Sequence, residues 1–422
     1  MALEEAPMPR VMLLIPSASY RAPDFMAAAS KLGVEVVVGT DRANPLEEAS
    51  AGRLLALDYA QPDLGAQQIE AYATLHPLDT IVAVDDGGTL VAARAARRLE
   101  LPYNAVSAVE ATRNKALLRE RLAAAGVPSP AYRVVPLAAD PVQVARDLES
   151  HRGYPVVLKP LALSASRGVI RANDVDEFVA AFERVRAILA TQEAEDECGA
   201  ELADRILVEA YVPGVEISIE GLLDDGRLRV LAIFDKPDPL EGPFFEETIY
   251  VTPSRLPEAD QRTLVDTTVA ACRALGLTYG AVHAELRLHE GRAYPIDIAA
   301  RSIGGLCSRT LDFGTGMSLE ELILRHATGT EVPTYIRDAQ AAGVMMIPIP
   351  RAGMLRSVTG LEAAQAVSYI TEVQIAIHAG GKVVPLPEGT EYLGFIFARA
   401  TTPAEVEQAL RAAHAALVFE IE

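Results

Sequence analysis

The sequence contains no tryptophan, only three cysteines and no long uninterrupted apolar run. The cysteines, Cys198, Cys272 and Cys307, are odd in number and far apart, which excludes a disulfide framework and favours a reducing compartment. Because no stretch of about 18 apolar residues occurs, we expect no transmembrane helix. The segment MALEEAPMPR lacks the basic and apolar parts of a signal peptide. We therefore expect a cytoplasmic protein without a membrane partner.

Basic residues are scarce relative to acidic ones. The chain has 38 Lys and Arg against 58 Asp and Glu, which gives a formal net charge of −20. Such a chain repels nucleic-acid phosphates and anionic lipid surfaces, so we expect neither as a partner. Two nucleotide-binding signatures are missing as well, because no GxGxxG motif follows an N-terminal strand and no GKS or GKT occurs. A small charged ligand, held by a local positive patch, remains compatible with this composition.

The N-terminal part alternates two kinds of pattern. In residues 11–105 short apolar runs alternate with helical spacing, which predicts a parallel sheet with helical crossovers. One run ends at Asp85, Asp86 and Gly87, and open α/β sheets bind ligands at the carboxyl ends of their strands. The alternative for Asp86 is that it only caps the following helix.

The segment GYPVVLKP, residues 153–160, is an apolar strand that ends at Lys159. A buried ammonium group needs an anion beside it, and a phosphate would meet that need. The small-residue loop that follows, with Ser164, Ser166 and Gly168, can cradle a phosphate through amide and hydroxyl groups. An ordinary hairpin turn would have a similar composition, so this stretch alone leaves both possibilities open.

Two other segments flank this strand. Asn114 and Lys115 open a helical run that ends at Gly126, and Lys115 taken alone is typical of a solvated helix lysine. The stretch ATQEAEDECGAELAD, residues 190–204, is acidic. It is typical of a surface excursion or a mobile loop, and we assign it no function.

Residues 206–223 comprise a strand that ends at Glu209, a bend at YVPG and a second strand that carries Glu216. The backbone of such a bend can hydrogen-bond the edge of a purine, and a nearby carboxylate can hold ribose hydroxyl groups. The alternative is an exposed edge hairpin. Further on, Lys236 begins a proline-rich loop that extends to about residue 250, and long loops of this kind are often lids.

Residues 280–305 contain two apolar runs around the triplet HEG, which predicts a β-hairpin with a short loop. If the loop has three residues, Leu288 pairs with Arg292, and Glu285 and Asp297 become diagonal neighbours on one face. Two carboxylates on one face favour a hard cation such as Mg²⁺. A two-residue loop would place them on opposite faces, and an ordinary exposed sheet face is the alternative.

These segments, in this order, resemble the ATP-grasp superfamily over nearly the whole chain. The resemblance implies an α/β fold, with α+β character in the ATP-binding part, and a C-terminal β-rich lobe. The implied domains are an N-terminal parallel α/β domain (residues 1–105), a small ATP-grasp subdomain (106–205), a large ATP-grasp subdomain (206–335) and the C-terminal lobe (336–422).

The layout is most similar to the L-amino-acid ligase branch of that superfamily. The similarity rests on His283 two residues before Glu285, on the RSIGG segment at 301–305, and on a C-terminal lobe with a YLGFIFA segment. The chain also resembles biotin carboxylases, but it has no biotinyl carrier segment with Met-Lys-Met.

The resemblance further implies roles for individual residues. ATP would be bound by phosphate-side lysines, a phosphate loop, an adenine hinge and a ribose acid, and Mg²⁺, with Mn²⁺ as an alternative, by two carboxylates. The implied residues are Lys115, Lys159 and Lys236 (phosphates), Ser164, Ser166 and Gly168 (loop), Glu209, Ala210, Tyr211 and Val212 (hinge), Glu216 (ribose), Glu285 and Asp297 (metal), and Arg301, His283, Gly304 and Gly305 (catalysis). Ala299 stands where relatives commonly have a further ligand, and a purely structural role is the alternative for His283.

The function that the resemblance implies is an ATP-dependent carboxylate–amine ligase. It would join small-molecule carboxylate and amine substrates, amino acids among them, through an acyl phosphate and release ADP and phosphate. Carboxylation of the biotin carboxylase type and a nucleotide-binding protein with a degenerate site are the alternatives. A homodimer is an expectation from the same resemblance.

Overall fold

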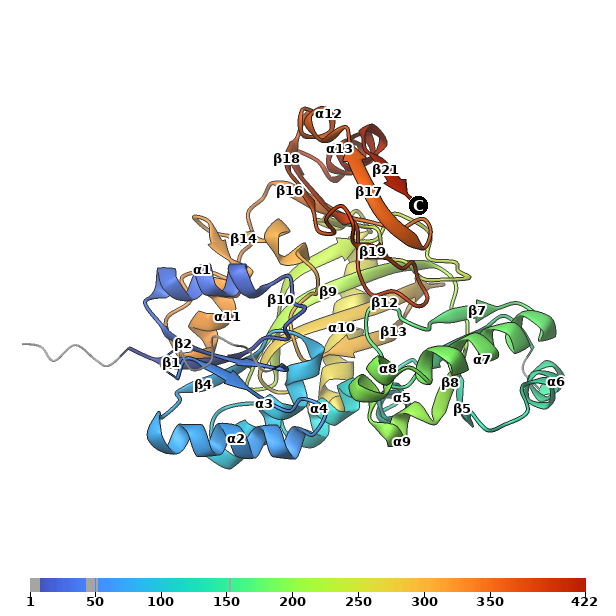
Figure 1. The fold of residues 1–422 in the computed structure, drawn as a ribbon, viewed down its shortest axis with the longest axis horizontal. Coiled ribbons are helices and arrows are strands. Elements are labelled where there is room, and N and C mark those ends of the chain that lie inside the picture. Colours follow the sequence, from blue (N-terminus) through green and yellow to red (C-terminus); the bar gives the residue numbers. More distant parts are fainter. Residues whose placement is uncertain (1–7, 43–49, 51, 152) are drawn as a thin grey trace, which may run out of the picture.

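A computed structural model describes residues 8–42, 50, 52–151 and 153–422. Figure 1 shows the N-terminal domain (blue) beside a smaller domain (green), with the C-terminal lobe (red) above them. The structure contains both a parallel sheet and antiparallel sheets, which confirms the mixed α/β class. Within the described residues, no helix combines the length and the apolar character needed to cross a membrane. All three cysteines are buried and free.

The N-terminal domain is built around a four-stranded sheet of order β3-β2-β1-β4, in which every pairing is parallel, as predicted. Its elements are β1 (Arg10–Leu14), α1 (Ala22–Leu32), β2 (Glu35–Thr40), β3 (Leu54–Ala56), α2 (Pro62–Leu75), β4 (Thr80–Ala83), α3 (Asp86–Leu99) and α4 (Val106–Arg113). Because parallel strands end at one edge of the sheet, the residues after β4, Asp85 and Asp86, lie beside the ends of β1 and β2. This edge faces the rest of the molecule.

The small subdomain has an antiparallel sheet of order β5-β8-β6-β7, covered by helices. Its elements are α5 (Lys115–Ala124), β5 (Tyr132–Pro136), α6 (Pro141–His151), β6 (Val156–Pro160), β7 (Ile170–Ala172), α7 (Val175–Leu189), α8 (Gln192–Cys198), α9 (Ala200–Ala203) and β8 (Arg205–Ala210). Strand β8 belongs to this sheet, so the sheet extends past the boundary predicted at residue 205. The acidic stretch 190–204 is mostly helical, rather than a mobile loop.

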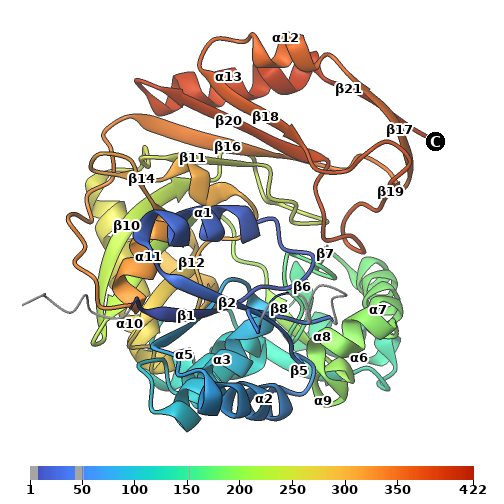
Figure 2. The ribbon, with the colours of Figure 1, turned by 60° about the vertical axis from the view of Figure 1, so that its left-hand side comes forward.

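A continuous eight-stranded sheet, of order β13-β12-β9-β10-β11-β16-β20-β18, joins the large subdomain to the C-terminal lobe. Strand β11 pairs with β16 across the predicted domain boundary, and Figure 2 shows the lobe stacked above the other domains. The large subdomain contains β9 (Val215–Asp224), β10 (Arg227–Asp235), β11 (Ile249–Thr252), α10 (Glu258–Leu275), β12 (Gly280–His289), β13 (Arg292–Ala299), η2 (Cys307–Thr310), β14 (Asp312–Phe313), β15 (Met317–Ser318) and α11 (Leu319–Ala327). The lobe contains β16 (Ala341–Ile347), β17 (Gly353–Thr359), α12 (Leu361–Gln365), β18 (Ile370–Ile375), β19 (Lys382–Val383), β20 (Gly394–Ala400), α13 (Pro403–Ala416) and β21 (Val418–Ile421).

The hairpin β12–β13 forms as predicted, but its loop is shorter. His289 pairs with Arg292, so the loop contains two residues, and the predicted pairing of Leu288 with Arg292 is wrong. Both loop residues have positive φ, 49° for Glu290 and 72° for Gly291. A turn of this kind matches the twist of the flanking strands, which explains why the shorter loop forms.

A β-bulge then corrects the register. Leu286 pairs with Pro295, whereas Glu285 pairs with Asp297, so Ile296 is the extra residue on β13. Without the bulge, a two-residue loop would put the two carboxylates on opposite faces. With it, Glu285 and Asp297 are direct cross-strand partners on one face, rather than the diagonal neighbours that we expected.

Candidate active site

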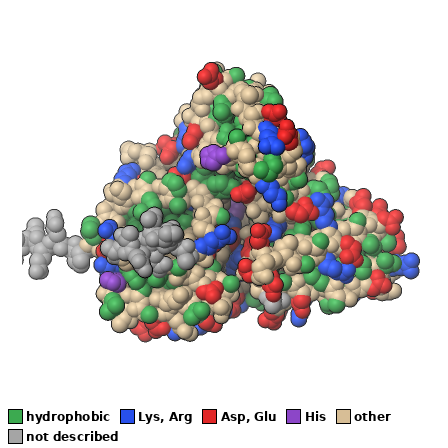
Figure 3. Space-filling view, viewed as in Figure 1, with side chains coloured by type: hydrophobic (Ala, Val, Ile, Leu, Met, Phe, Trp, Pro, Cys, Tyr) green, Lys and Arg blue, Asp and Glu red, His purple; other side chains and the backbone are tan. Residues whose placement is uncertain are grey.

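A cavity of about 1310 Å³ lies where the N-terminal domain, both subdomains and the C-terminal lobe meet. Figure 3 shows the surface hollowed between the N-terminal domain and the small subdomain. The predicted site residues that line it are Lys115, Lys159, Ser164, Ser166, Glu209, Ala210, Tyr211, Val212, Glu216, His283, Glu285, Asp297, Arg301, Gly304 and Gly305. Gly168 and Lys236 are not among the lining residues of this cavity.

Lys159 is buried at the end of β6, and its partner is a carboxylate of the protein. Its Nζ lies 2.7 Å from Oε2 of Glu209, whose Oε1 accepts a hydrogen bond from Nε of Arg119 at 2.5 Å. The side chains of Lys159, Glu209 and Arg119 are 6%, 2% and 0% exposed. Burial alone would raise the pKa of Glu209, but Arg119 and Lys159 outweigh it and lower that pKa to about 2. The anion that the sequence required is therefore Glu209.

Arg119 was not predicted as a site residue, because in the sequence it is one of several charged residues of a helix. Its remaining nitrogens donate to the backbone carbonyls of Pro295 (3.1 Å) and Ile296 (2.6 Å). These carbonyls lie at the bulge of β13, where the ladder cannot satisfy every backbone group. One guanidinium group thus joins Glu209 to the bulge that sets the register of Asp297.

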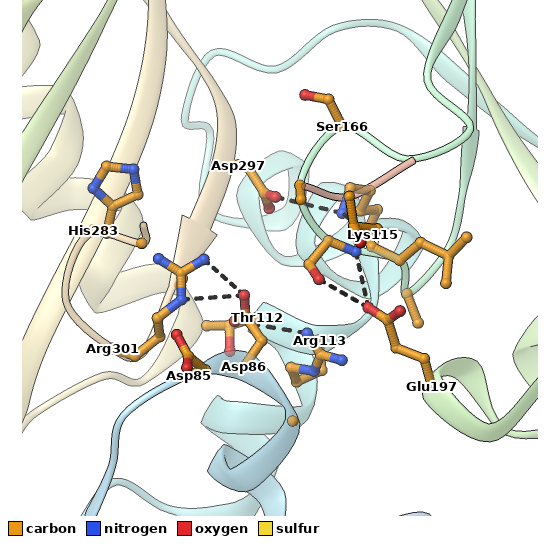
Figure 4. A pocket seen from close by; sticks show the side chains of 18 of the residues that line it. Asp85, Asp86, Thr112, Arg113, Lys115, Ser166, Glu197, His283, Asp297 and Arg301 are labelled. Atoms are coloured by element: carbon orange, nitrogen blue, oxygen red, sulfur yellow. Dashed lines mark hydrogen bonds and ion pairs between the residues drawn. The ribbon is translucent and has the colours of Figure 1, made fainter. Parts of the chain in front are cut away.

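Lys115 begins α5 because Asn114 caps that helix, accepting hydrogen bonds from the amides of Ala116 and Leu117. The capped helix end points Lys115 toward the loop after β6. Its Nζ donates to the carbonyl of Leu163 at 3.0 Å and lies 3.4 Å from Oδ2 of Asp297. Figure 4 shows Lys115 and Asp297 facing one another across the cavity.

The loop of residues 161–168 is held by the acidic segment of residues 190–204. The amide and hydroxyl groups of Ser164 both donate to Oε1 of Glu197, at 3.1 and 2.8 Å. The amide of Gly168 donates to the carbonyl of Pro387 from the C-terminal lobe at 2.9 Å. Ser166 has a φ of 55° and contributes to the wall of the cavity.

Lys236 lies among three carboxylates. Its Nζ is 2.9 Å from Oε1 of Glu216 and 3.4 Å from Oε1 of Glu285, and it also contacts Glu247. One oxygen from each of the three acids lies within 4.8 Å of the others. Burial opposes the charge on Lys236, but the three acids raise its pKa well above the usual value. Burial and the neighbouring Glu285 raise the pKa of Glu247 to about 7. Asp297 is not part of this group.

His283 is buried between two acids. Its Nδ1 lies 3.2 Å from Oε2 of Glu220, and its Nε2 lies 3.4 Å from Oε1 of Glu285. Burial lowers the pKa of His283, but the two carboxylates outweigh it, so the net shift is upward. Glu220, which the sequence did not single out, also accepts a hydrogen bond from the amide of Ile303 at 3.0 Å.

Arg301 lies at the floor of the cavity and is paired with Asp86 from the N-terminal domain. Its Nε and Nη2 donate to Oδ2 of Asp86 at 3.1 and 2.7 Å, as Figure 4 shows. Burial alone would raise the pKa of Asp86, but Arg301 and Arg113 lower it to about 2. Asp86 does begin α3, but the cap position belongs to Asp85, and the side chain of Asp85 makes no capping bond. The alternative that Asp86 only caps the helix is therefore wrong.

The bend after β8 is tied to β12 by Arg287. Its side chain donates to Oε2 of Glu216 (2.9 Å), the hydroxyl of Tyr211 and the carbonyl of Val212 (both 3.0 Å). The bend ends at Gly214, whose φ is 99°, and a Cβ there would lie 2.1 Å from the carbonyl oxygen of Leu288. Only glycine fits this turn, so the bend is pressed against the hairpin.

Comparisons with known proteins give matches along most of the chain. Three family models match the chain: an ATP-grasp N-terminal domain at residues 26–103, an ATP-grasp domain at 152–310, and the L-amino acid ligase C-terminal domain 2 at 345–422. The crystal structure of L-amino acid ligase from Bacillus licheniformis has a TM-score of 0.83 and 25% sequence identity, over 98% of this chain and 99% of that chain.

The chain belongs to the ATP-grasp superfamily.

Within the ATP-grasp superfamily it is similar to the L-amino acid ligases. The alanine–anticapsin ligase of Bacillus subtilis is 30% identical over 61% of this chain and 56% of that protein. The chain therefore spans somewhat more than half the length of this curated relative. Biotin carboxylase from Campylobacter jejuni shares the fold, with a TM-score of 0.66, 16% identity, and 98% of this chain and 92% of that chain covered.

Proposed function

We propose that this protein is an ATP-dependent ligase that joins a carboxylate and an amine, both from amino acids, and releases ADP and phosphate. The observation that carries the proposal is that one cavity is lined by Lys115 and Lys159 on one side and by Glu285 and Arg301 on the other. The names of its relatives, alanine–anticapsin ligase and L-amino acid ligase, support the same chemistry.

We assign the nucleotide to the side of the cavity between the two subdomains. Lys115, Lys159 and Lys236 contribute fixed positive charge for the triphosphate, and the loop with Ser164, Ser166 and Gly168 covers it. The hinge, residues 209–212, meets the adenine, and Glu216 meets the ribose hydroxyls. In the free protein these lysines are paired with carboxylates, which keeps them oriented. Lys115 and Lys159 line the cavity and can bind phosphate oxygens directly, whereas Lys236 contacts Glu216 and Glu285, which line it.

The carboxylates of the hairpin fit a magnesium ion. Carboxylate oxygens are the ligands that Mg²⁺ prefers, and Mn²⁺ accepts the same set. We assign the metal to Glu285 and Asp297, the direct partners across the bulge. Ala299 offers no ligand, whereas Glu247 lies close enough to Glu285 to share in the site. When bound, the ion offsets negative charge on phosphate oxygens.

The reaction proceeds in two steps. A carboxylate oxygen of the first substrate attacks the γ-phosphorus of ATP, and the bond from that phosphorus to the bridging oxygen of ADP breaks. The deprotonated amine of the second substrate then attacks the acyl carbon, phosphate leaves, and the nitrogen releases a proton. Arg301 and the amides of Gly304 and Gly305 stabilise the oxyanion and the departing phosphate. His283, held by Glu220, orients Glu285.

The acyl phosphate must be kept from water. The loop of residues 161–168 belongs to the small subdomain, and the loop between β10 and β11 contacts that subdomain, since the amide of Arg171 donates to the carbonyl of Pro243 at 2.8 Å. Closure of these loops excludes water and commits the intermediate to the amine.

The direct test is to incubate the protein with ATP, Mg²⁺ and pooled amino acids and to identify the nucleotide products. We expect ADP, phosphate and a dipeptide, and AMP with pyrophosphate would contradict the acyl-phosphate route. Bicarbonate-dependent ADP release with free biotin would instead support carboxylation. ATP binding without turnover on a matrix of carboxylates and amines would support a nucleotide-binding protein with a degenerate site.

Two substitutions test the assignment of residues. We expect Arg301→Ala to lower the rate of amide formation about 100- to 1,000-fold while ATP still binds, because only the transition state needs that charge. Glu285→Ala should lower turnover and raise the Mg²⁺ concentration needed for half-maximal rate, because one of the assigned metal ligands is lost. Arg205→Ala, which removes an exposed ion pair with Asp204, is the control. Full turnover by either site variant would contradict the assignment.

A further inference from the structure

Arg301 is oriented by a residue from a different domain. Asp86 lies 215 residues away in the sequence, at the start of α3, and a single oxygen, Oδ2, accepts both hydrogen bonds from Nε and Nη2 of Arg301. Nη1 of Arg301 donates to the carbonyl of Ser302 at 3.0 Å. The side chains of Asp86 and Arg301 are each 15% exposed, so the pair is largely enclosed by protein.

Ser302 and Ile303, the two residues after Arg301, are also held by charged side chains. Arg21, which is 1% exposed, donates to the hydroxyl of Ser302 at 2.7 Å and to the carbonyl of Val84 at 2.9 Å. Glu220 accepts from the amide of Ile303. Residues 301–303 are thus each fixed by a charged side chain, and two of these, Arg21 and Asp86, come from the N-terminal domain.

The guanidinium of Arg301 keeps hydrogen-bond donors for a substrate. It has about five N–H groups, of which two bind Asp86 and one binds Ser302. The remaining donors are available to a group in the cavity that Arg301 lines. A carboxylate that binds one edge of a planar guanidinium fixes the direction in which its other edges point.

Asp86 is shared between two guanidinium groups. Its other oxygen, Oδ1, lies 3.6 Å from Nη1 of Arg113, which is 11% exposed. Burial opposes the charge on Arg301, but Asp86, Asp85 and Glu220 together raise its pKa, so Arg301 stays charged at the floor of the cavity.

We propose that Asp86 is a positioning residue that holds Arg301 in the orientation required for acyl transfer. The N-terminal domain thereby completes a reaction centre that the small and large subdomains form. This proposal rests on the ligase function proposed above. Asp86 itself does not touch the reacting atoms, and its effect is transmitted through Arg301.

The first experiment compares Asp86→Asn with Glu70→Gln in amide formation from the best amino-acid pair. Asparagine has nearly the same shape as aspartate but carries no charge. Glu70 is the control, because it pairs with Arg98 at 2.9 Å on the outside of the same domain and its side chain is 44% exposed. We expect Asp86→Asn to lower kcat about 10- to 100-fold, because a small misplacement of a catalytic group has an effect of that size. The KM for ATP and the turnover of Glu70→Gln should stay within about twofold of the wild type. An unchanged or increased kcat for Asp86→Asn would overturn the proposal, and an increase would mean that Asp86 blocks Arg301.

A double substitution separates positioning from a general structural role. If Asp86 acts through Arg301, then Asp86→Asn should have little further effect in the background of Arg301→Lys. Independent effects would multiply the two losses and would contradict the proposal. Asp86→Glu should recover part of the kcat lost in Asp86→Asn, because it restores the carboxylate.

A measurement without turnover keeps the proposal testable if the ligase function fails. The Nε–H signal of Arg301 in nitrogen-15 NMR spectra is identified by its absence in Arg301→Lys. In the wild type we expect this proton to exchange slowly with water, and at least about tenfold faster in Asp86→Asn. Equal exchange rates would refute the positioning role, whereas faster exchange in a protein that ligates no substrate would refute only the function.

Discussion

Two parts of the cavity wall, here called the strand side and the loop side, are held in different ways. On the strand side, Lys159, Glu209 and Arg119 form a buried charged group whose side chains are at most 6% exposed. On the loop side, residues 161–168 are held by Glu197 and by a backbone contact to Pro387. Arg184 and Glu388 form a nearby ion pair at 2.6 Å, and the side chain of each is more than 40% exposed.

This difference indicates a division of tasks. Charges on buried strands and on a capped helix cannot reorient, so they stabilise a transition state without reorganisation. The loop of residues 161–168 is held by separate, part-buried hydrogen bonds. It can open for substrates and close again, because each such bond contributes little net free energy. The predictions below test this contrast, beginning with the largest expected effect.

Arg119→Met should be the most damaging of these substitutions. It leaves the buried carboxylate of Glu209 with one partner fewer and removes both donors to the carbonyls of the bulge. We expect the free energy of unfolding to fall by about 3–5 kcal/mol, which is typical when a buried ion pair loses one member. Urea denaturation followed by circular dichroism measures this change. A loss below about 1 kcal/mol would show that the strand side is no more firmly held than the loop side.

Acid should remove the stability that the buried carboxylates contribute. The pKa values of Glu209 and Asp86 are both lowered to about 2, from ordinary values of 4.5 and 3.8. A carboxyl with a depressed native pKa stabilises the fold above its unfolded pKa, and this stabilisation is lost as the pH falls toward the native value. We therefore expect the free energy of unfolding to decrease between about pH 4.5 and pH 2. In Arg119→Met, where the pKa of Glu209 rises, the decrease should be shallower, and an identical pH profile would contradict the assignment.

Arg184→Met should have the smallest effect. The pair with Glu388 links the small subdomain to the C-terminal lobe on the surface, where water and salt screen it. We expect a change within about 1 kcal/mol in the free energy of unfolding. That difference from the wild type should vanish in concentrated salt. A loss as large as that of Arg119→Met would mean that the loop side is fixed as firmly as the strands.

Much of the fold follows from local patterns. The alternation in residues 11–105 predicts the parallel sheet, and the apolar runs around residue 290 predict the hairpin. The order of the segments pointed to the ATP-grasp superfamily, to which the chain belongs. These features can be predicted because propensity, periodicity and turn chemistry act over a few neighbouring residues.

The candidate site depends on long-range side-chain contacts, which local sequence patterns do not reveal. Asp86 and Arg301 are 215 positions apart, and Arg119 and Glu209 are 90 apart. In the sequence, Asp86 resembles a helix cap and Arg119 an ordinary helix residue. Only the packing of the domains brings these residues to their partners. The energy of an ion pair depends on distance and burial rather than on sequence spacing, so the pairs cannot be read from the sequence.

The hairpin β12–β13 shows most clearly what the sequence determines and what the tertiary structure decides. The sequence by itself determined two strands, a short turn within residues 289–291, and two carboxylates within reach of one another. Only the tertiary structure decided that both carboxylates share a face, because the two-residue turn alone would have separated them. The extra residue at Ile296 restores the shared face, and Arg119 from a distant helix satisfies its carbonyl. A bulge of this kind is stable only where another element supplies the hydrogen bonds that the ladder has lost.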